Sequence, residues 1–88
     1  MINKAYTILA PEGMHARPAT AMVKLAKQFQ SVIFLKYGEK AVRLNSLLTI
    51  LSMGIRGGST IVIEIDGADE DAAIAAFDTF FAANLKDW

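Results

Sequence analysis

The chain has 88 residues, a length that fits one domain and leaves little room for a second. Hydrophobic residues make up 53% of it, which excludes a disordered segment. Nine Lys and Arg balance nine Asp and Glu, so a nucleic-acid partner is not expected, because binding to a phosphate backbone needs a basic excess. With one His and no Cys, neither a disulfide framework nor a typical structural zinc site can form, and no metal or cofactor is expected.

Nothing in the sequence reads as a targeting or membrane-spanning segment. The first residues lack the charged start and apolar run of a signal peptide. The most apolar stretch, 47–55, is interrupted by Thr49, Ser52 and Gly54, and is far shorter than the roughly 20 residues of a membrane span. We therefore expect a single domain over residues 1–88, a cytoplasmic location and no membrane insertion.

The first half of the chain predicts a strand, a helix and a hairpin. A β-branched and aromatic run predicts a strand at 2–8, followed by a loop at 10–15. Apolar residues at helical spacing predict a helix at 16–28, with an inner stripe of Ala19, Met22, Val23, Ala26 and Phe29. Strands at 31–37 and 41–44 flank a turn at Gly38-Glu39, and their inward side chains are Ile33, Leu35, Tyr37, Val42 and Leu44.

The second half predicts a short helix, a strand and a long helix. Ser46 is placed to cap an apolar helix at 47–53. Alternating isoleucines predict the clearest strand of the chain at 61–66. Asp69 then caps a last helix, whose first turn carries Glu70 and Asp71 and whose core stripe is Ile74, Phe77 and Phe81. Asp87 and Trp88 are expected to form a frayed end.

This order of elements, β-α-β-β-α-β-α, predicts an α+β fold. We expect an open-faced two-layer sandwich, in which three helices cover one face of a four-stranded antiparallel sheet. The other face would contact water, which accounts for the alternate positions Thr7, Lys36, Arg43 and Glu64, with Phe34 on the same side. A fold class by itself does not define a function.

The segment Gly13-Met14-His15-Ala16-Arg17-Pro18-Ala19 carries the candidate chemistry. Pro18 falls in the first turn of the predicted helix, so His15 lies where the loop meets the helix. The amides of Ala16 and Arg17 and the helix dipole favour an anion there, and the Arg17 guanidinium can hold phosphate oxygens. The dipole also favours a neutral, nucleophilic imidazole. Two interpretations stay open: a phosphohistidine site, or a capping His15 beside a solvated Arg17.

The same heptad resembles the active-site motif of HPr, the histidine-containing phosphocarrier family of the bacterial phosphoenolpyruvate-dependent sugar phosphotransferase system. Asn45-Ser46-Leu47-Leu48 with Met53-Gly54-Ile55 resembles the family's regulatory helix. Asp66-Gly67-Ala68-Asp69-Glu70 resembles its last strand-to-helix junction. The resemblance covers essentially every predicted element in order.

This resemblance implies a phosphoryl carrier rather than an enzyme with its own small substrate. Enzyme I, charged by phosphoenolpyruvate, would pass a phosphoryl group to Nδ1 of His15, and His15 would pass it to an EIIA domain of a sugar permease. Arg17 and the backbone of Ala16 and Arg17 would stabilise the phosphate. Phosphoryl transfer needs mainly positioning and charge stabilisation, which such a helix start supplies in part.

Ser46 has two candidate roles. A capping hydroxyl stabilises a helix by about 1 kcal/mol. In Gram-positive HPr proteins the matching serine is phosphorylated by HPr kinase/phosphorylase, so the resemblance also implies a regulatory phosphorylation site. Kinase-regulated members usually read Lys-Ser-Ile-Met-Gly, whereas this chain reads Asn45-Ser46-Leu47-Leu48-Thr49. The Asn-Ser pair and Met14 resemble the nitrogen-related paralogue, so the sugar and nitrogen branches both stay open.

The resemblance places partner contacts around His15. Leu44, Ile50 and Leu51 are expected to point largely inward, and Leu47 and Leu48 outward. The predicted partner contacts are Met14, Thr20, Leu47, Leu48 and Leu51. The expected partners are enzyme I, EIIA domains and, where the host has it, HPr kinase/phosphorylase. A monomer is expected, with a dimer as the alternative because relatives exchange strands.

Three other functions are weighed against transfer. A regulatory HPr-like module would act by binding alone, but it would not need to retain His15 and Arg17. An RNA-binding domain is disfavoured by the zero net charge and by the lack of an aromatic pair on a predicted central strand. An independent hydrolase is disfavoured because no second base or metal constellation accompanies His15.

Overall fold

The computed structural model describes residues 1–9 and 11–84. Ala10 of the predicted loop and the predicted frayed end at Asp87 and Trp88 lie outside these residues. The elements follow one another as β1 (Ile2–Thr7), α1 (Ala16–Ala26), β2 (Val32–Tyr37), β3 (Lys40–Arg43), α2 (Leu47–Leu51), β4 (Thr60–Asp66) and α3 (Glu70–Asn84).

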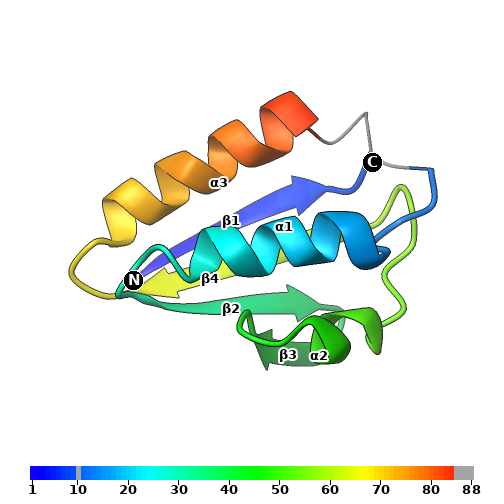
Figure 1. The fold of residues 1–88 in the computed structure, drawn as a ribbon, viewed down its shortest axis with the longest axis horizontal. Helices are drawn as coiled ribbons and strands as arrows, with labels where there is room; N and C mark the ends of the chain where they lie inside the picture. Colours follow the sequence, from blue (N-terminus) through cyan, green and yellow to red (C-terminus); the bar gives the residue numbers. More distant parts are fainter. Residues whose placement is uncertain (10, 85–88) are drawn as a thin grey trace.

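The four strands form one antiparallel sheet in the order β1-β4-β2-β3, and the three helices lie on one face of it (Figure 1). In the register, Tyr6 of β1 is opposite Ile61 of β4, and Ile33 of β2 is opposite Ile65 of β4. The predicted fold class and element order are confirmed.

The core lies between the sheet and the helices. Ile61, Ile63 and Ile65 of β4 are completely buried, as the strict alternation of the strand requires. Ala19 and Met22 of α1 and Phe77 of α3 are also fully buried and belong to the same core cluster. Burial of a large apolar side chain such as Ile63, Met22 or Phe77 contributes about 1.5–3 kcal/mol. The apolar periodicity of each element therefore determines which of its faces turns inward.

Two helices end earlier than their apolar patterns predict. Helix α1 stops at Ala26, and the next amides bond three residues back, Gln28 to Leu25 and Phe29 to Ala26. Helix α2 stops at Leu51, and the Met53 amide donates to Ile50. These tighter turns are common at helix ends. Within residues 1–9 and 11–84, no helix is both long enough and apolar enough to cross a membrane.

The uncovered face of the sheet carries polar and charged side chains at the four predicted positions. Thr7 and Arg43 are exposed, and Lys36 and Glu64 on adjacent strands form an ion pair. Phe34 is partly exposed and, like Lys36, lies on the face opposite the buried Ile33 and Leu35. A pair of opposite charges on neighbouring strands adds only a few tenths of a kcal/mol. This face therefore contributes less to the stability of the fold than the buried face does.

Tyr6 attaches α3 to the edge strand β1. Its hydroxyl donates to Asp78 Oδ1 at 2.7 Å, and its ring stacks on Phe81 with centroids 4.2 Å apart. Lys4 Nζ lies 2.7 Å from the same Asp78 oxygen. The bonds from Lys4 and Tyr6 lower the pKa of Asp78, while burial raises the pKa of Tyr6 above its ordinary value. Tyr6 therefore holds β1 to α3 in two ways, by its ring stack on Phe81 and by the hydrogen bond to Asp78.

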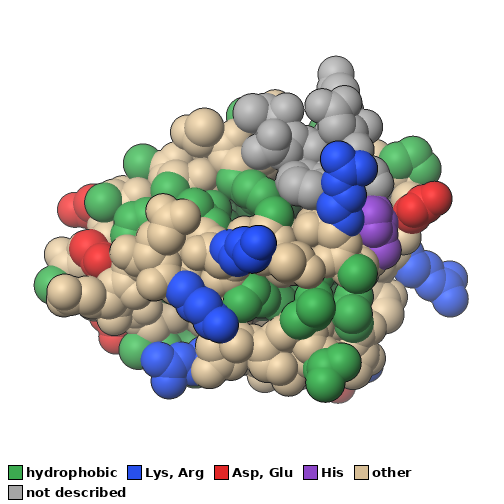
Figure 2. Space-filling model, viewed as in Figure 1, with side chains coloured by type: hydrophobic (Ala, Val, Ile, Leu, Met, Phe, Trp, Pro, Cys, Tyr) green, Lys and Arg blue, Asp and Glu red, His purple; other side chains and the backbone are tan. Residues whose placement is uncertain are grey.

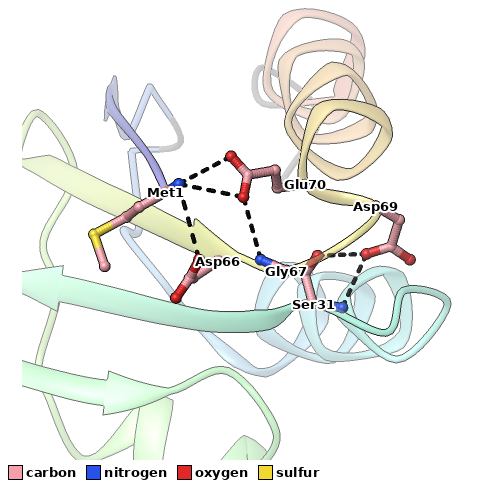
Figure 3. Close-up of polar contacts among 6 residues, drawn as sticks. All are labelled: Met1, Ser31, Asp66, Gly67, Asp69 and Glu70. Carbon is pink, nitrogen blue, oxygen red and sulfur yellow. Dashed lines mark hydrogen bonds and ion pairs between the residues drawn. The ribbon is translucent and has the colours of Figure 1, made fainter.

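Asp69 holds two corners of the fold together (Figure 3). Its carboxylate accepts hydrogen bonds from the amides of Gln30 (2.7 Å) and Ser31 (2.9 Å) and from the Ser31 hydroxyl. Its carbonyl accepts the amide of Ala73 at 2.9 Å. Asp69 therefore begins α3 through its carbonyl, as its predicted position requires, while its side chain reaches across to the start of β2, which local sequence does not reveal. These hydrogen bonds, first that from Ser31, lower the pKa of Asp69.

Gly67 permits this close approach of the two corners. A Cβ at Gly67 would lie 2.6 Å from Ser31 Cα, closer than atoms can pack. The Gly67 amide donates to Glu70 Oε1 at 3.3 Å, and the Met1 amino nitrogen lies 3.0 Å from Glu70 Oε2 (Figure 3). The β4–α3 junction thus needs a residue without a side chain at this position.

The Asp69 contacts predict a specific pH dependence. Because folding lowers the pKa of Asp69 below its ordinary 3.8, the contribution to stability is present above that value. It is lost as the pH falls through the lower, folded-state pKa. We expect the free energy of unfolding of Asp69→Asn to fall less than that of the wild type below about pH 4, as measured by urea denaturation. Asp71→Asn neutralises an exposed carboxylate in the same helix turn, and its free energy of unfolding should depend on pH as in the wild type. Parallel curves of unfolding free energy against pH for the wild type and Asp69→Asn would contradict this role of Asp69.

Candidate functional site

His15 occupies the N-cap position of α1 without using its side chain as a cap. Its backbone is extended (φ −96°, ψ −174°), and its carbonyl accepts the Ala19 amide at 3.1 Å. Within the described part of the chain the imidazole makes no capping hydrogen bond, and 32% of the side chain is exposed. The capping interpretation of the imidazole is therefore wrong: the backbone of His15 begins the helix, and its ring does not cap it.

The loop before His15 is held by the segment after α2. Gly13 has φ +75°, and a Cβ there would lie 2.8 Å from Arg56 Cα and closer still to the Ile55 carbonyl oxygen. The next amide, that of Met14, donates to this carbonyl at 3.0 Å. Glycine is needed here for both reasons, since other residues disfavour positive φ and would collide with the backbone. The site is thus built from two distant segments.

The start of α1 is suited to an anion. No acidic residue lies in its first turn, and Arg17 is exposed there. Pro18 is buried in the first turn, where a missing N–H costs nothing. Backbone N–H groups and the positive dipole end at a helix start attract phosphate, and a guanidinium can bind phosphate oxygens bidentately.

Glu12 forms a charge contact with His15 that the sequence did not predict. Its Oε2 lies 3.7 Å from His15 Nε2, and its side chain is 76% exposed. The signal was available, because a residue three positions before an N-cap histidine can turn back toward it. It was obscured because Glu12 belongs to a loop whose conformation depends on Gly13 and the distant Ile55.

Ser46 begins α2 but does not cap it with its hydroxyl. Its backbone is extended (φ −138°, ψ 121°), and its carbonyl accepts the Ile50 amide at 3.3 Å. No hydrogen bond joins the Ser46 side chain to the helix start in the described structure, so this part of the prediction is corrected. The helix has five residues and is held by the complete burial of Ile50, which makes a side-chain cap dispensable.

The predicted contact residues differ in exposure. Leu48 is 78% exposed, whereas Leu47 and Leu51 are half-buried and pack against the core. Thr20 is also half-buried, and its hydroxyl donates to the Ala16 carbonyl at 2.6 Å. Met14 needs correction: only 6% of it is exposed, because the Met14–Ile55 hydrogen bond draws it into the core. Leu44 and Ile50 are buried as expected.

Hydrophobic surface lies next to the histidine. Figure 2 shows the purple histidine surface beside green hydrophobic side chains over α2. Leu48 is the most exposed of these α2 residues, and Leu47 and Leu51 are half-buried. A small apolar patch next to an exposed cation and an imidazole is typical of a transient protein-binding surface.

Comparison with known proteins agrees with this geometry. The family described as "PTS HPr component phosphorylation site" matches residues 2–83. A histidine-containing phosphocarrier protein of Mycoplasma is 35% identical, with a TM-score of 0.85 over 90% of each chain. HPr from Thermoanaerobacter tengcongensis is 31% identical, with a TM-score of 0.84 over 97% of this chain and 100% of that one.

A third similar structure is that of Crh, the Bacillus subtilis catabolite repression protein. It is 26% identical, with a TM-score of 0.72 over 93% of this chain and 94% of that one. Its structure is described as a domain-swapped, intertwined dimer.

The fold and the family match over residues 2–83 define the class of protein as a phosphocarrier protein of the phosphotransferase system. The chain belongs to the HPr family, the phosphocarrier proteins of the phosphotransferase system.

Gly13 offers a test of how the histidine loop is held. We expect Gly13→Ala to destabilise the protein by about 3 kcal/mol, because it combines positive-φ strain with a backbone collision. Gly38→Ala is the matched control, since Gly38 has φ +61° but open space around it, and should cost about 1 kcal/mol. Equal losses of unfolding free energy in the two variants would show that the approach to Ile55 and Arg56 is not a constraint.

Proposed function

We propose that this protein accepts a phosphoryl group on His15 from phospho-enzyme I and passes it to EIIA domains of sugar permeases. One observation carries the proposal: in a chain of the HPr family, the imidazole lies partly exposed at the start of α1 and is not used to cap it. We propose that the protein performs this function as a monomer in the cytoplasm.

The proposed phosphoryl transfer depends on the positions of the His15 imidazole, the start of α1 and the Arg17 guanidinium. A lone pair on Nδ1 of His15 forms the bond to phosphorus, while the bond from phosphorus to the donor atom breaks and leaves its electron pair on that atom. The helix start, through the backbone at Ala16 and Arg17, and the Arg17 guanidinium would hold the phosphoryl oxygens. Since phosphoryl transfer depends mostly on positioning and charge, the partner can supply what remains.

We propose that partners dock on α2 and the start of α1. Leu48 would provide the central apolar contact because it is the most exposed of the α2 leucines, with Leu47, Leu51 and Thr20 around it. A phosphate on Ser46, added by an HPr kinase/phosphorylase where the host has one, would place negative charge beside this apolar surface and weaken docking.

A regulatory module that acts by binding alone is the second candidate function. The similarity to Crh, a catabolite repression protein, favours it. It differs from the first proposal in one observable property, because a binding module need not carry a phosphoryl group on His15.

Replacement of His15 tests the carrier function directly. With phosphoenolpyruvate and enzyme I, we expect one acid-labile phosphoryl group on the wild type and none on His15→Ala, as measured by intact mass before and after acid treatment. The free energy of unfolding of His15→Ala should stay within about 0.5 kcal/mol of the wild type, because a partly exposed, non-capping side chain is lost. A wild type that accepts no phosphoryl group from cognate or nitrogen-branch enzyme I would favour the binding module.

Ser46→Asp tests the proposed docking surface. We expect its affinity for enzyme I to fall about tenfold, because a new charge lies beside the surface that the leucines form. Leu48→Ala should weaken binding by a similar factor through lost apolar contact. Thr79→Asp, at an exposed position of α3, should bind like the wild type by calorimetry. Unchanged affinity in Ser46→Asp would place Ser46 outside the interface.

A further inference from the structure

Glu12 is a charged group whose position the proposed function leaves unexplained. Its carboxylate lies 3.7 Å from Nε2 of His15, although a negative charge there repels the phosphoryl group that the proposed function brings to the site. A carboxylate beside a phosphate-binding site opposes phosphate binding, so its presence is explained only if it also acts on another group. The group with which it forms an ion-pair contact is Nε2 of the imidazole, the ring nitrogen that does not take part in the proposed transfer.

We infer that Glu12 is a positioning residue that keeps the ring proton of His15 on Nε2 and stabilises the ring during transfer; this inference rests on the proposed function. A neutral imidazole carries one proton, on either nitrogen. A negative charge beside Nε2 favours the proton there, because the same charge lies farther from a proton on Nδ1. The lone pair then resides on Nδ1, the nitrogen that can attack phosphorus.

The carboxylate also acts on the charge that develops in the reaction. When the Nδ1 lone pair forms the bond to phosphorus and the donor atom departs with its electron pair, the ring retains its Nε2 proton and becomes positively charged. A carboxylate near Nε2 interacts more strongly with this charged ring than with the neutral one. Interactions that strengthen toward the transition state raise the rate rather than the binding affinity.

The interaction is electrostatic and not a hydrogen bond. A separation of 3.7 Å exceeds hydrogen-bond range, and the Glu12 side chain is largely exposed. Arg17, in the first turn of α1, supplies a charge of the opposite sign for the phosphoryl oxygens. The two charges would act on different ends of the same ring: Arg17 on the incoming phosphate, and Glu12 on the far nitrogen.

Glu12→Gln tests the inference because it removes the charge and keeps the shape. We expect nitrogen NMR of the neutral ring to show a smaller proportion of the Nε2–H form than in the wild type. The maximal rate of phosphoryl acceptance should fall about threefold to tenfold, with the KM for phospho-enzyme I unchanged. Asp71→Ala removes a carboxylate from the start of α3, at the opposite end of the molecule from the start of α1 (Figure 1), and should alter neither quantity.

The outcomes separate this inference from the proposed function. An unchanged proton distribution in Glu12→Gln overturns the inference while the wild type still accepts phosphate. A changed distribution with an unchanged maximal rate, or an effect confined to KM, overturns it as well, since Glu12 would then be a docking residue. A wild type that accepts no phosphoryl group overturns the proposed function, and the inference falls with it.

Discussion

The hydrogen bond from the Met14 amide to the Ile55 carbonyl organises the functional end of the molecule. It joins the loop before α1 to the segment after α2, which lie far apart in the sequence. The approach is possible only because Gly13 has no side chain and adopts positive φ. The contact fixes the loop that leads into His15 against the segment that follows α2, and Met14 is buried there.

Separate elements supply the parts of the site. Helix α1 gives the dipole and Arg17, the loop gives His15 and Glu12, and α2 gives the apolar surface. A surface of this kind presents the partly exposed imidazole at its edge instead of enclosing it. That arrangement suits a protein whose chemistry is completed by a partner, because each partner can provide its own groups to the same exposed ring.

Periodicity made most of the fold predictable from the sequence. The alternation in β4 and the 3.6-residue stripe of α1 identify the buried faces without any tertiary information, and the structure confirms them. The prediction was less accurate where a residue's partner is distant. Met14 is buried through Ile55, the Asp69 carboxylate reaches Ser31, and Ser46 begins its helix without a capping hydroxyl. Local patterns do not contain such contacts.

The pairing of β1 with β4 has a consequence for folding. The pairs run from Thr7 with Thr60 to Ile2 with Ile65, so more than fifty residues separate the two members of each pair. The β2–β3 hairpin, in contrast, closes over a short turn. Since closing a long chain segment costs more entropy than closing a short one, the edge strand β1 should join the sheet late. The rate of folding is then governed by the arrival of β1 at the sheet, and the Tyr6 stack on Phe81 forms only after that arrival.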